Sequence, residues 1–377
     1  MFRFVVLFLI SLTLAQVHFV LVNPVLAQFD PTDGLEIPDG EGEVETAPVI
    51  EPVLLDPGLP ETDPAHDAFV NGVEAFKVRD YDQAFDDWFP IAEEGVAAAG
   101  HNLAVLFELG LGVEKDPEAA AFWYRMAALE GEIPDAMTNL GFLYARGMGV
   151  ALDHGQAAHW FQRAADQDFA QGQYNLAIAY LQGKGIRRDE VKAFGWMRAA
   201  AEQGYRPAQY NLAGLYLQGR GVEADAAQAF DWFARAARQG DRFARFNQGL
   251  MLYRGQGTTK DLEAAAGHIR EAAEAGVVPA QNLLGALYAN GEGLPRDLDQ
   301  ALYWLQVAAG LGNEEALTNL DRLKSHVGDE RMARAARRAQ DFQPKDVPHA
   351  WPGRRFVNNQ VTEGDELFDL PPDVEDP

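Results

Sequence analysis

The chain has 377 residues, with 57 acidic against 31 basic side chains, a formal net charge of -26 and no cysteine. So acidic a chain lacks the basic footprint that nucleic-acid binding requires, and without cysteine it has neither a disulfide framework nor a thiol nucleophile. A length of 377 residues ordinarily means two or three domains, unless the chain is a repeat array whose units pack only on their neighbours.

Residues 1–27 have the parts of a secretory signal peptide. Arg3 precedes an apolar run from Phe4 to Val22, and the small residue Ala27 ends the segment. We expect cleavage after Ala27 and an exported chain, periplasmic or secreted. An uncleaved membrane anchor is the alternative, because the run approaches the length that spans a bilayer. After removal of this segment, the sequence predicts no transmembrane helix.

Two acidic segments flank the predicted folded part. Residues 28–64 contain eleven acidic residues, seven prolines and no Lys or Arg, and residues 342–377 end in EGDELFDLPPDVEDP. Such segments do not bury enough apolar surface to fold, so the sequence predicts a disordered linker and a disordered tail. Residues 65–341 carry 38 acidic and 27 basic residues, so over half of the net negative charge lies outside the predicted folded part.

A G-x-G pair recurs in the folded part, first after 37 residues and then every 36. The pairs are Gly110/Gly112, Gly147/Gly149, Gly183/Gly185, Gly219/Gly221, Gly255/Gly257 and Gly291/Gly293. A fixed period in the thirties is typical of a stacked helical array. Phosphate-binding loops also contain such glycines, but none of the six pairs has a third glycine at the fingerprint spacing. We therefore interpret them as turns.

An Asp follows each first glycine by six residues and is expected to cap a second helix. These residues are Asp116, Asp153, Asp189, Asp225, Asp261 and Asp297. In three units a Gln stands three residues after the Asp, which predicts partial capping boxes: Gln156, Gln228 and Gln300. Each unit is thus predicted to contain a helix A, a glycine turn and an Asp-capped helix B.

Each predicted helix B carries packing residues and ends at a position that suits a left-handed cap. A Trp stands at Trp123, Trp160, Trp196, Trp232 and Trp304, with His268 in the fifth unit, and paired alanines follow. The predicted caps are Gly95, Gly131, Asp168, Gly204, Gly240, Gly276 and Gly312. A half unit, VRDYDQAFDDWFPIAEEG, begins the array, and a last helix A, EEALTNLDRL, closes it.

The repeated pattern A-x-Y-N-L-A/G-x-L-Y-x-x-G-x-G-V-x-x-D, with A-x-x-W and paired alanines after it, resembles the Sel1-like repeat family. This family is a relative of the tetratricopeptide repeats. The resemblance covers about residues 66–326 and implies an all-α fold, a right-handed α-α superhelical solenoid of six to seven helix-turn-helix repeats placed at 65–326. It also implies a protein-binding scaffold.

By resemblance to tetratricopeptide repeats, the outward positions of helix A line a concave groove. An Asn recurs there and is expected either to hydrogen-bond an extended peptide or to pin a neighbouring turn: Asn102, Asn139, Asn175, Asn211 and Asn247. The preceding aromatic residues either anchor a partner or fill gaps between helices: Tyr174, Tyr210 and Phe246. Helical periodicity also turns Gly214 and Leu217 outward. Arg146 and Arg254 are candidates for charge recognition at the groove edge.

Residues 327–341 are predicted to form a C-terminal capping helix with one basic face. Arg331, Arg334 and Arg338 share that face, while alanines and Met332 suit docking on the array. Two interpretations stay open. In the first, the arginines of a terminal cap pair with acidic residues of the repeats. In the second, they contact a partner or a membrane surface.

Taken together, these features predict a non-catalytic periplasmic scaffold that binds another protein or peptide in the cell envelope and regulates or assembles an envelope system. The alternative is a structural or cell-wall-associated protein that binds glycan or murein stem peptide. No cofactor or metal site is predicted. Ser325 is the only serine after residue 27, and His154 and His159 lie on different helix faces. The oligomeric state is not determined by the sequence.

Overall fold

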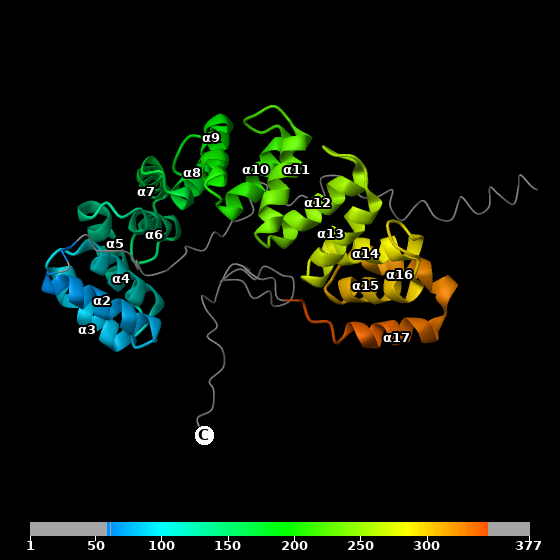
Figure 1. The fold of residues 1–377 in the computed structure, drawn as a ribbon, viewed down its shortest axis with the longest axis horizontal. Coiled ribbons are helices and arrows are strands. Elements are labelled where there is room, and N and C mark those ends of the chain that lie inside the picture. Colours follow the sequence, from blue (N-terminus) through cyan, green and yellow to red (C-terminus); the bar gives the residue numbers. More distant parts are fainter. Residues whose placement is uncertain (1–58, 61, 346–377) are drawn as a thin grey trace, which may run out of the picture. The chain divides into compact units, whose positions relative to one another are not determined.

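The computed structural model describes residues 59–60 and 62–345, which fall into two compact units (Figure 1). We call residues 59–224 the N-terminal unit and residues 225–345 the C-terminal unit. The described residues form sixteen helices and no strand, and none of these helices is long and apolar enough to cross a membrane. The predicted signal peptide lies outside the described residues, as do most of the predicted linker and tail.

The N-terminal unit is a stack of helical hairpins. Consecutive helices pack on one another, and helices A of neighbouring repeats also touch, as α6 and α8 do. Its helices are α2 (Pro64–Lys77), α3 (Tyr81–Glu93), α4 (Ala97–Leu109), α5 (Pro117–Glu130), α6 (Pro134–Arg146), α7 (His154–Asp166), α8 (Ala170–Gln182), α9 (Glu190–Glu202) and α10 (Arg206–Gln218). From α4 onward, even-numbered helices are helices A of the repeats, and odd-numbered helices up to α15 are helices B.

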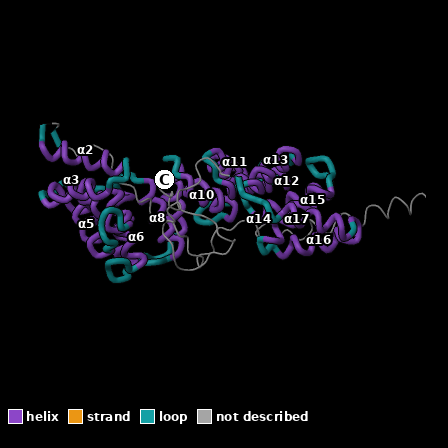
Figure 2. The backbone as a smooth tube through the Cα atoms, turned by 90° about the horizontal axis from the view of Figure 1, so that it is seen from below, coloured by secondary structure: helices purple, strands orange, loops and turns teal. Residues whose placement is uncertain are grey.

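The C-terminal unit continues the same alternation (Figure 2). Its helices are α11 (Ala226–Arg238), α12 (Arg242–Arg254), α13 (Leu262–Glu274), α14 (Val278–Asn290), α15 (Leu298–Gly310), α16 (Glu314–Val327) and α17 (Asp329–Ala339). Each helix packs on the next, α14 also contacts α16, and α17 lies against α15. The predicted all-α solenoid of helical hairpins is confirmed.

The six predicted Asp caps are confirmed. Each Asp carboxylate accepts a hydrogen bond of 2.9 to 3.1 Å from a backbone N–H in the first turn of its helix B. This satisfies amides that have no partner within the helix.

At two of the predicted capping boxes, the backbone N–H of the cap residue is bonded to the preceding helix. In a capping box, the third residue of the helix satisfies the backbone N–H of the cap. Here the N–H of Asp153 donates to the carbonyl of Tyr144, and that of Asp297 to Tyr288, each at 2.9 Å. The cap amide is therefore tied to the preceding helix A, which holds the turn between the two helices closed.

The two glycines of each pair have separate structural reasons. The first is the left-handed C-cap of helix A, with φ between 67° and 73° in all six repeats. The second also has positive φ, and a Cβ there would lie 1.8 to 2.6 Å from the backbone of the first residue of the preceding repeat's helix B. The second glycine thus lets one repeat approach the next, and the turn interpretation is confirmed.

The predicted left-handed cap at Gly131 is wrong, while the other six predicted caps have positive φ. Gly131 has φ -98°, and Glu132 takes the left-handed conformation instead, with φ 51°. The turn contains one extra residue, which moves the left-handed position by one. Gly131 is glycine for another reason, because a Cβ there would lie 2.2 Å from the Cβ of Ala97.

The repeated Trp positions are buried to different degrees. Trp160, Trp232 and Trp304 are 5 to 6% exposed and are buried beside their paired alanines, whereas Trp123 and Trp196 are half-buried. Small alanines at the helix contacts allow the helix axes to approach closely, so that the large rings fill the space between hairpins.

The array begins with a complete hairpin where a half unit is predicted. The segment before the half unit forms α2, capped by Asp63, and packs against α3. Trp88 of α3 is fully buried, and its Nε1 donates to the carbonyl of Phe69 at 3.1 Å. A Cβ on Gly72 would lie 2.4 Å from the same ring, so this glycine makes room for the Trp.

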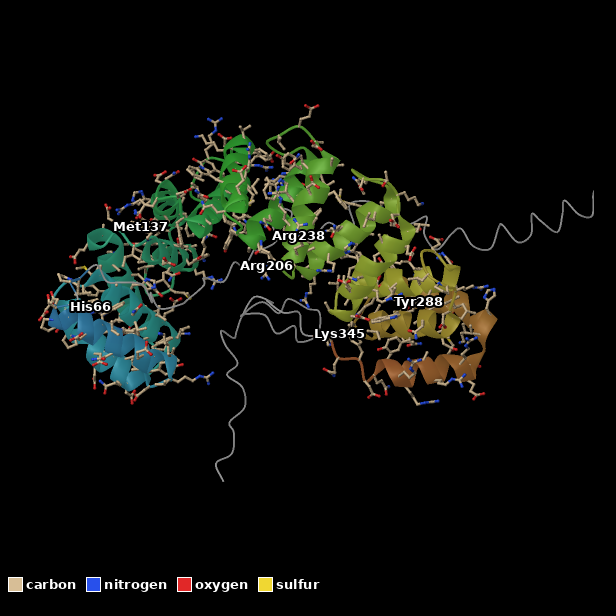
Figure 3. All side chains as sticks on the ribbon, viewed as in Figure 1. His66, Met137, Arg206, Arg238, Tyr288 and Lys345 are labelled. Carbon is tan, nitrogen blue, oxygen red and sulfur yellow. The ribbon has the colours of Figure 1, made fainter. Side chains whose placement is uncertain are left out.

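The array ends with α17 and the four residues of the predicted tail that the structure describes. The ring of Phe342 meets that of Trp304 edge to face, with centroids 5.8 Å apart. The backbone N–H of Lys345, a residue labelled in Figure 3, donates to the carbonyl of Glu274. This hydrogen bond is 2.8 Å long, and Lys345 Nζ lies 2.6 Å from the Glu274 carboxylate. The packed chain therefore extends past Phe342, where the unstructured tail was predicted to begin.

Candidate functional site

The five predicted Asn residues all lie on helices A, and all are covered by the protein itself. Asn102, Asn139, Asn175, Asn211 and Asn247 are 0 to 9% exposed. They were expected to line an open groove. Instead the folded chain leaves almost none of their surface exposed.

Two contacts show what this position does in the fold. Asn211 Nδ2 donates to the Tyr174 hydroxyl at 3.1 Å and to the Pro207 carbonyl at 2.9 Å. Three repeats further along the chain, Asn319 Nδ2 donates to Asn282 Oδ1 at 3.0 Å. In each case the Asn of one helix A binds the residue before the equivalent position of the previous helix A. At these two positions, the side chain joins neighbouring helices, while recognition of a peptide by the other Asn residues stays a prediction.

The predicted aromatic anchors are covered to a similar degree. Tyr174 and Phe246 are 1% and 2% exposed, and only Tyr210 is half-buried. Gly214, expected to face outward, is buried, and Leu217 is half-buried. Of the two expected roles for the aromatic residues, the burial of Tyr174 and Phe246 agrees with the filling of gaps between helices. Anchoring of a partner stays a prediction for Tyr210.

Arg146 and Arg254 are the last residues of α6 and α12, and both are half-buried. A positive charge at this end of a helix interacts favourably with its carbonyl groups. Arg146 also lies close enough to Glu108 to lower the pKa of that carboxyl. The two arginines belong to different units.

A buried polar pair that the sequence analysis missed lies on α4 and α5. The Tyr124 hydroxyl donates to Glu108 Oε2 at 2.8 Å, and the exposed fractions of the two side chains are 0% and 3%. Burial raises the pKa of Glu108 to about 7, although the Tyr124 hydrogen bond and Arg146 act in the opposite direction. Burial and the neighbouring Glu108 also raise the pKa of Tyr124.

The sequence contains a signal for this pair. Glu108 stands two residues before the first turn glycine, where the other five repeats have Ala145, Leu181, Leu217, Tyr253 and Ala289. Tyr124 follows the Trp position, where the other repeats carry an apolar residue. Two polar residues within one repeat, at positions that are mostly apolar in the other repeats, predict a buried pair, since each requires a partner.

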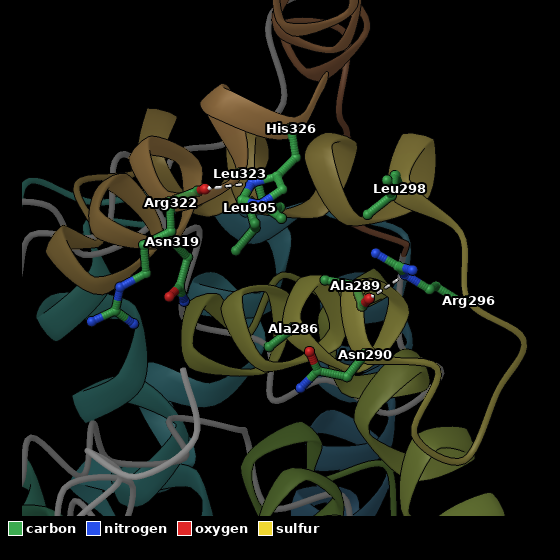
Figure 4. Close-up of a pocket in the computed structure, with 10 residues that line it drawn as sticks. All are labelled: Ala286, Ala289, Asn290, Arg296, Leu298, Leu305, Asn319, Arg322, Leu323 and His326. Atoms are coloured by element: carbon green, nitrogen blue, oxygen red, sulfur yellow. Dashed lines mark hydrogen bonds between the residues drawn. The ribbon is translucent and has the colours of Figure 1, made fainter. Parts of the chain in front are cut away.

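The C-terminal unit contains a pocket of about 100 Å³ between α14, α15 and α16 (Figure 4). Its apolar part is formed by Ala286, Ala289, Leu298, Leu305 and Leu323, and its polar part by Asn290, Arg296, Asn319, Arg322 and His326. Arg296 precedes the capping Asp of α15, and its Nε donates to the Ala289 carbonyl at 2.9 Å. In Figure 4 the Arg296 guanidinium points toward the middle of the pocket, while Arg322 lies at the rim beyond Asn319.

The basic face of α17 is turned toward the array, as expected for a terminal cap. Arg331 Nε donates to Asp299 of α15 at 2.5 Å, and the Arg338 guanidinium lies 5.0 Å from the centre of the Tyr303 ring. Arg331 holds the pKa of Asp299 below its usual range, with help from Arg334 and Arg338. Ala335 is buried between these arginines. Pairing of the arginines with acidic residues of the repeats is thus confirmed for Arg331.

Comparisons with known proteins agree with this architecture. The family model described as Sel1 repeat matches residues 97–132, 134–169, 170–205, 206–241, 243–277 and 278–313. A Sel1 repeat protein from Oxalobacter formigenes is 29% identical, with a TM-score of 0.57 over 64% of this chain and 96% of that one. The protective antigen c5321 of uropathogenic Escherichia coli, which displays an SLR fold, is 29% identical, with a TM-score of 0.52 over 74% of this chain and 68% of that one. No curated protein matches.

Proposed function

Because the chain belongs to the Sel1 repeat family, we propose that it is a non-catalytic periplasmic scaffold that binds another protein and assembles or regulates a cell-envelope system. Sel1 repeat proteins are generally protein-interaction scaffolds. The compartment, the envelope system and the absence of catalysis are the finer parts of the proposal, and the sequence of residues 1–27 supports export.

The observation that carries the proposal is the pocket between α14 and α16. Peptide recognition combines apolar surface with a few placed polar groups, and this pocket has both. The polar groups come from two helices A and from a turn, so that their arrangement depends on the stacking of consecutive repeats. The proposed binding surface is therefore formed by consecutive repeats together, as in a scaffold protein.

Support for export comes from the sequence of residues 1–27, which has a basic start, an apolar run and a small residue at its end. Fractionation of the native host, followed by mass determination of the protein's N-terminus, tests this step. We expect a chain that begins at Gln28 in the periplasmic or secreted fraction. A chain that retains Met1 in the cytoplasmic fraction contradicts export.

Site-specific photo-crosslinking in intact cells tests the binding function. A benzophenone amino acid at Asn290 places the probe at the pocket, and the same probe at Val191, which is 70% exposed on α9, is the matched control. We expect one protein in stoichiometric yield from the pocket position and none from the control. Enrichment on purified murein, with no protein crosslinked, would reject the proposal in favour of a cell-wall-associated role.

A further inference from the structure

The lining of the pocket between α14, α15 and α16 has a charge opposite to that of the chain as a whole. The protein carries 57 acidic residues and a net charge of -26, yet none of the ten lining residues is acidic. Three of them, Arg296, Arg322 and His326, are basic residues instead. An apolar surface beside guanidinium groups fits a ligand that is both apolar and anionic.

We propose that this pocket binds the C-terminal residue of a partner polypeptide, with its free carboxylate at Arg296 and its apolar side chain on Leu305 and Leu323. The inference rests on the proposed function and specifies which segment of the partner the array recognises. A C-terminal residue carries a carboxylate and a side chain on the same Cα, so one residue meets both parts of the lining. An internal Asp or Glu has the anion alone.

The apolar part of the pocket is formed by alanine and leucine side chains, which suits an aliphatic side chain of the ligand. Ala286 and Leu305 are 2% and 1% exposed, so the apolar floor belongs to the rigid contact between α14 and α15. A floor of this kind is formed before the ligand arrives.

The polar groups have the hydrogen-bonding capacity that a chain terminus needs. Arg296 uses Nε to bind Ala289, which orients the guanidinium and leaves its two Nη groups for a carboxylate. Asn319 uses Nδ2 to bind Asn282, so its Oδ1 is the atom that it offers to a peptide N–H. Arg322, at the rim in Figure 4, is placed for a carbonyl or acidic group of a preceding residue.

The experiment uses arrays of random octapeptides with free carboxyl ends, probed with the purified protein, followed by fluorescence polarisation with selected peptides in solution. We expect the last position to be enriched in Ala, Val and Leu. Amidation of the terminus should weaken binding about tenfold or more, because it removes a charge-assisted pair.

Two substitutions locate the binding. Arg296→Gln should weaken binding of the free acid about tenfold and leave binding of the amide unchanged, whereas Arg322→Gln should weaken binding of the acid and of the amide alike. Arg188→Gln is the matched control, because Arg188 holds the position of Arg296 in another repeat, directly before the capping Asp, and lies outside the pocket. The affinity of the Arg188→Gln variant for the free acid should equal that of the unmodified protein. Circular dichroism verifies that each variant is folded.

Several results overturn the inference. Equal affinity for acid and amide, or full affinity in both pocket variants, shows that no carboxylate is held there. Enrichment of an internal motif, independent of the terminus, rejects the inference while the scaffold function stands. Tighter binding of muropeptides ending in D-alanine than of any L-peptide assigns the pocket to cell wall and rejects a polypeptide partner. Absence of any peptide binding rejects the inference, and the crosslinking experiment separately decides the function.

Discussion

At the scale of the residue, the same register position has different chemistry in different repeats. Glu108 stands where the other repeats have Ala, Leu or Tyr, and it is buried against Tyr124. The second turn glycine, in contrast, is required in every repeat because a neighbouring backbone occupies the space of its side chain. A substitution at either kind of position is therefore expected to change stability through contacts between helices, and not through the propensity of its own helix.

Glu108 is expected to make stability depend on pH near neutrality. Its pKa is raised from 4.5 to about 7 in the folded protein, so the folded state binds the proton more tightly than the unfolded state. The stabilising contribution of this proton is complete below the unfolded value and is lost as the pH rises through the folded value. Relative to Glu108→Gln, the unmodified protein should lose up to about 3 kcal/mol of unfolding free energy between pH 4.5 and 8.

Urea unfolding of both proteins across this pH range measures the difference, in which contributions common to the two proteins cancel. Glu130→Gln, at an exposed position of α5, is the control for a change of charge alone. Parallel pH profiles for the unmodified protein and Glu108→Gln would show that the buried carboxyl does not change its protonation.

The second glycine of a turn is expected to resist substitution more strongly than other glycines. A Cβ on Gly185 would lie 1.8 Å from the carbonyl oxygen of His154, and its φ is +71°. Gly185→Ala should therefore cost about 2 kcal/mol or more. Gly204→Ala, with φ +88° and open space around the Cβ, should cost about 1 kcal/mol through backbone strain alone.

Denaturant unfolding measures both losses, and Gly195→Ala in the middle of α9 provides a control of opposite sign. No atom lies within 4 Å of its added Cβ and its φ is negative, so alanine should stabilise the helix by up to about 1 kcal/mol. Equal losses at Gly185 and Gly204 would mean that backbone conformation, and not the close approach of the next repeat, demands glycine.

At the scale of the element, the Asp cap of α9 is bonded in two directions. The Asp189 carboxylate accepts from the backbone N–H of Lys192 at 3.0 Å, and its own N–H donates to the Tyr180 carbonyl at 3.1 Å. The side chain therefore starts α9, while the backbone fastens α9 to α8. Only the bond of the side chain can be removed by a substitution at Asp189.

Asp189→Ala is expected to lower the unfolding free energy by about 1 kcal/mol, because the backbone N–H of Lys192 in the first turn of α9 loses its acceptor. Asp189→Asn should keep most of the stability, since its amide oxygen accepts the same bond. Thermal unfolding of the three proteins at one pH provides the comparison. A loss in the Asn variant as large as that in the Ala variant would show that charge at the helix end, and not the cap bond, is the stabilising feature.

At the scale of the whole molecule, each repeat is expected to be stabilised by its contacts with the adjacent repeats. Helix α17 covers an apolar cluster that includes Leu302, Leu305 and Ala316, and it contacts α15 and α16. No contact of α17 with α11 or α12 is among the principal helix contacts of the C-terminal unit. In an array of this kind, the loss of a terminal helix weakens the adjacent repeat first.

A chain that ends at Val327 should therefore exchange backbone hydrogens faster in α15 and α16, with little change in α11 and α12. Hydrogen exchange followed by mass spectrometry makes the measurement. Arg331→Ala is the matched control, because it removes an exposed ion pair and keeps the buried Ala335, and it should leave exchange nearly unchanged. Equal acceleration in all helices of the C-terminal unit would contradict coupling between nearest neighbours.

The sequence predicted the elements far better than the site. The six Asp caps lie where the period places them, while the Gly131 cap is displaced because its turn has one extra residue. The Asn positions were located correctly, but Asn211 and Tyr174 bind each other across two helices. The pocket was not predicted, because Arg296 comes from a turn and Arg322 from another repeat.

The sequence by itself determined the repeat, the helix boundaries and the turns, because caps and left-handed glycines depend on the geometry of a few consecutive residues. Only the tertiary structure decided which polar side chains are covered, where Glu108 finds Tyr124, and which residues surround the pocket. These properties depend on the distance and angle between neighbouring hairpins. The periodicity of a single helix contains neither quantity.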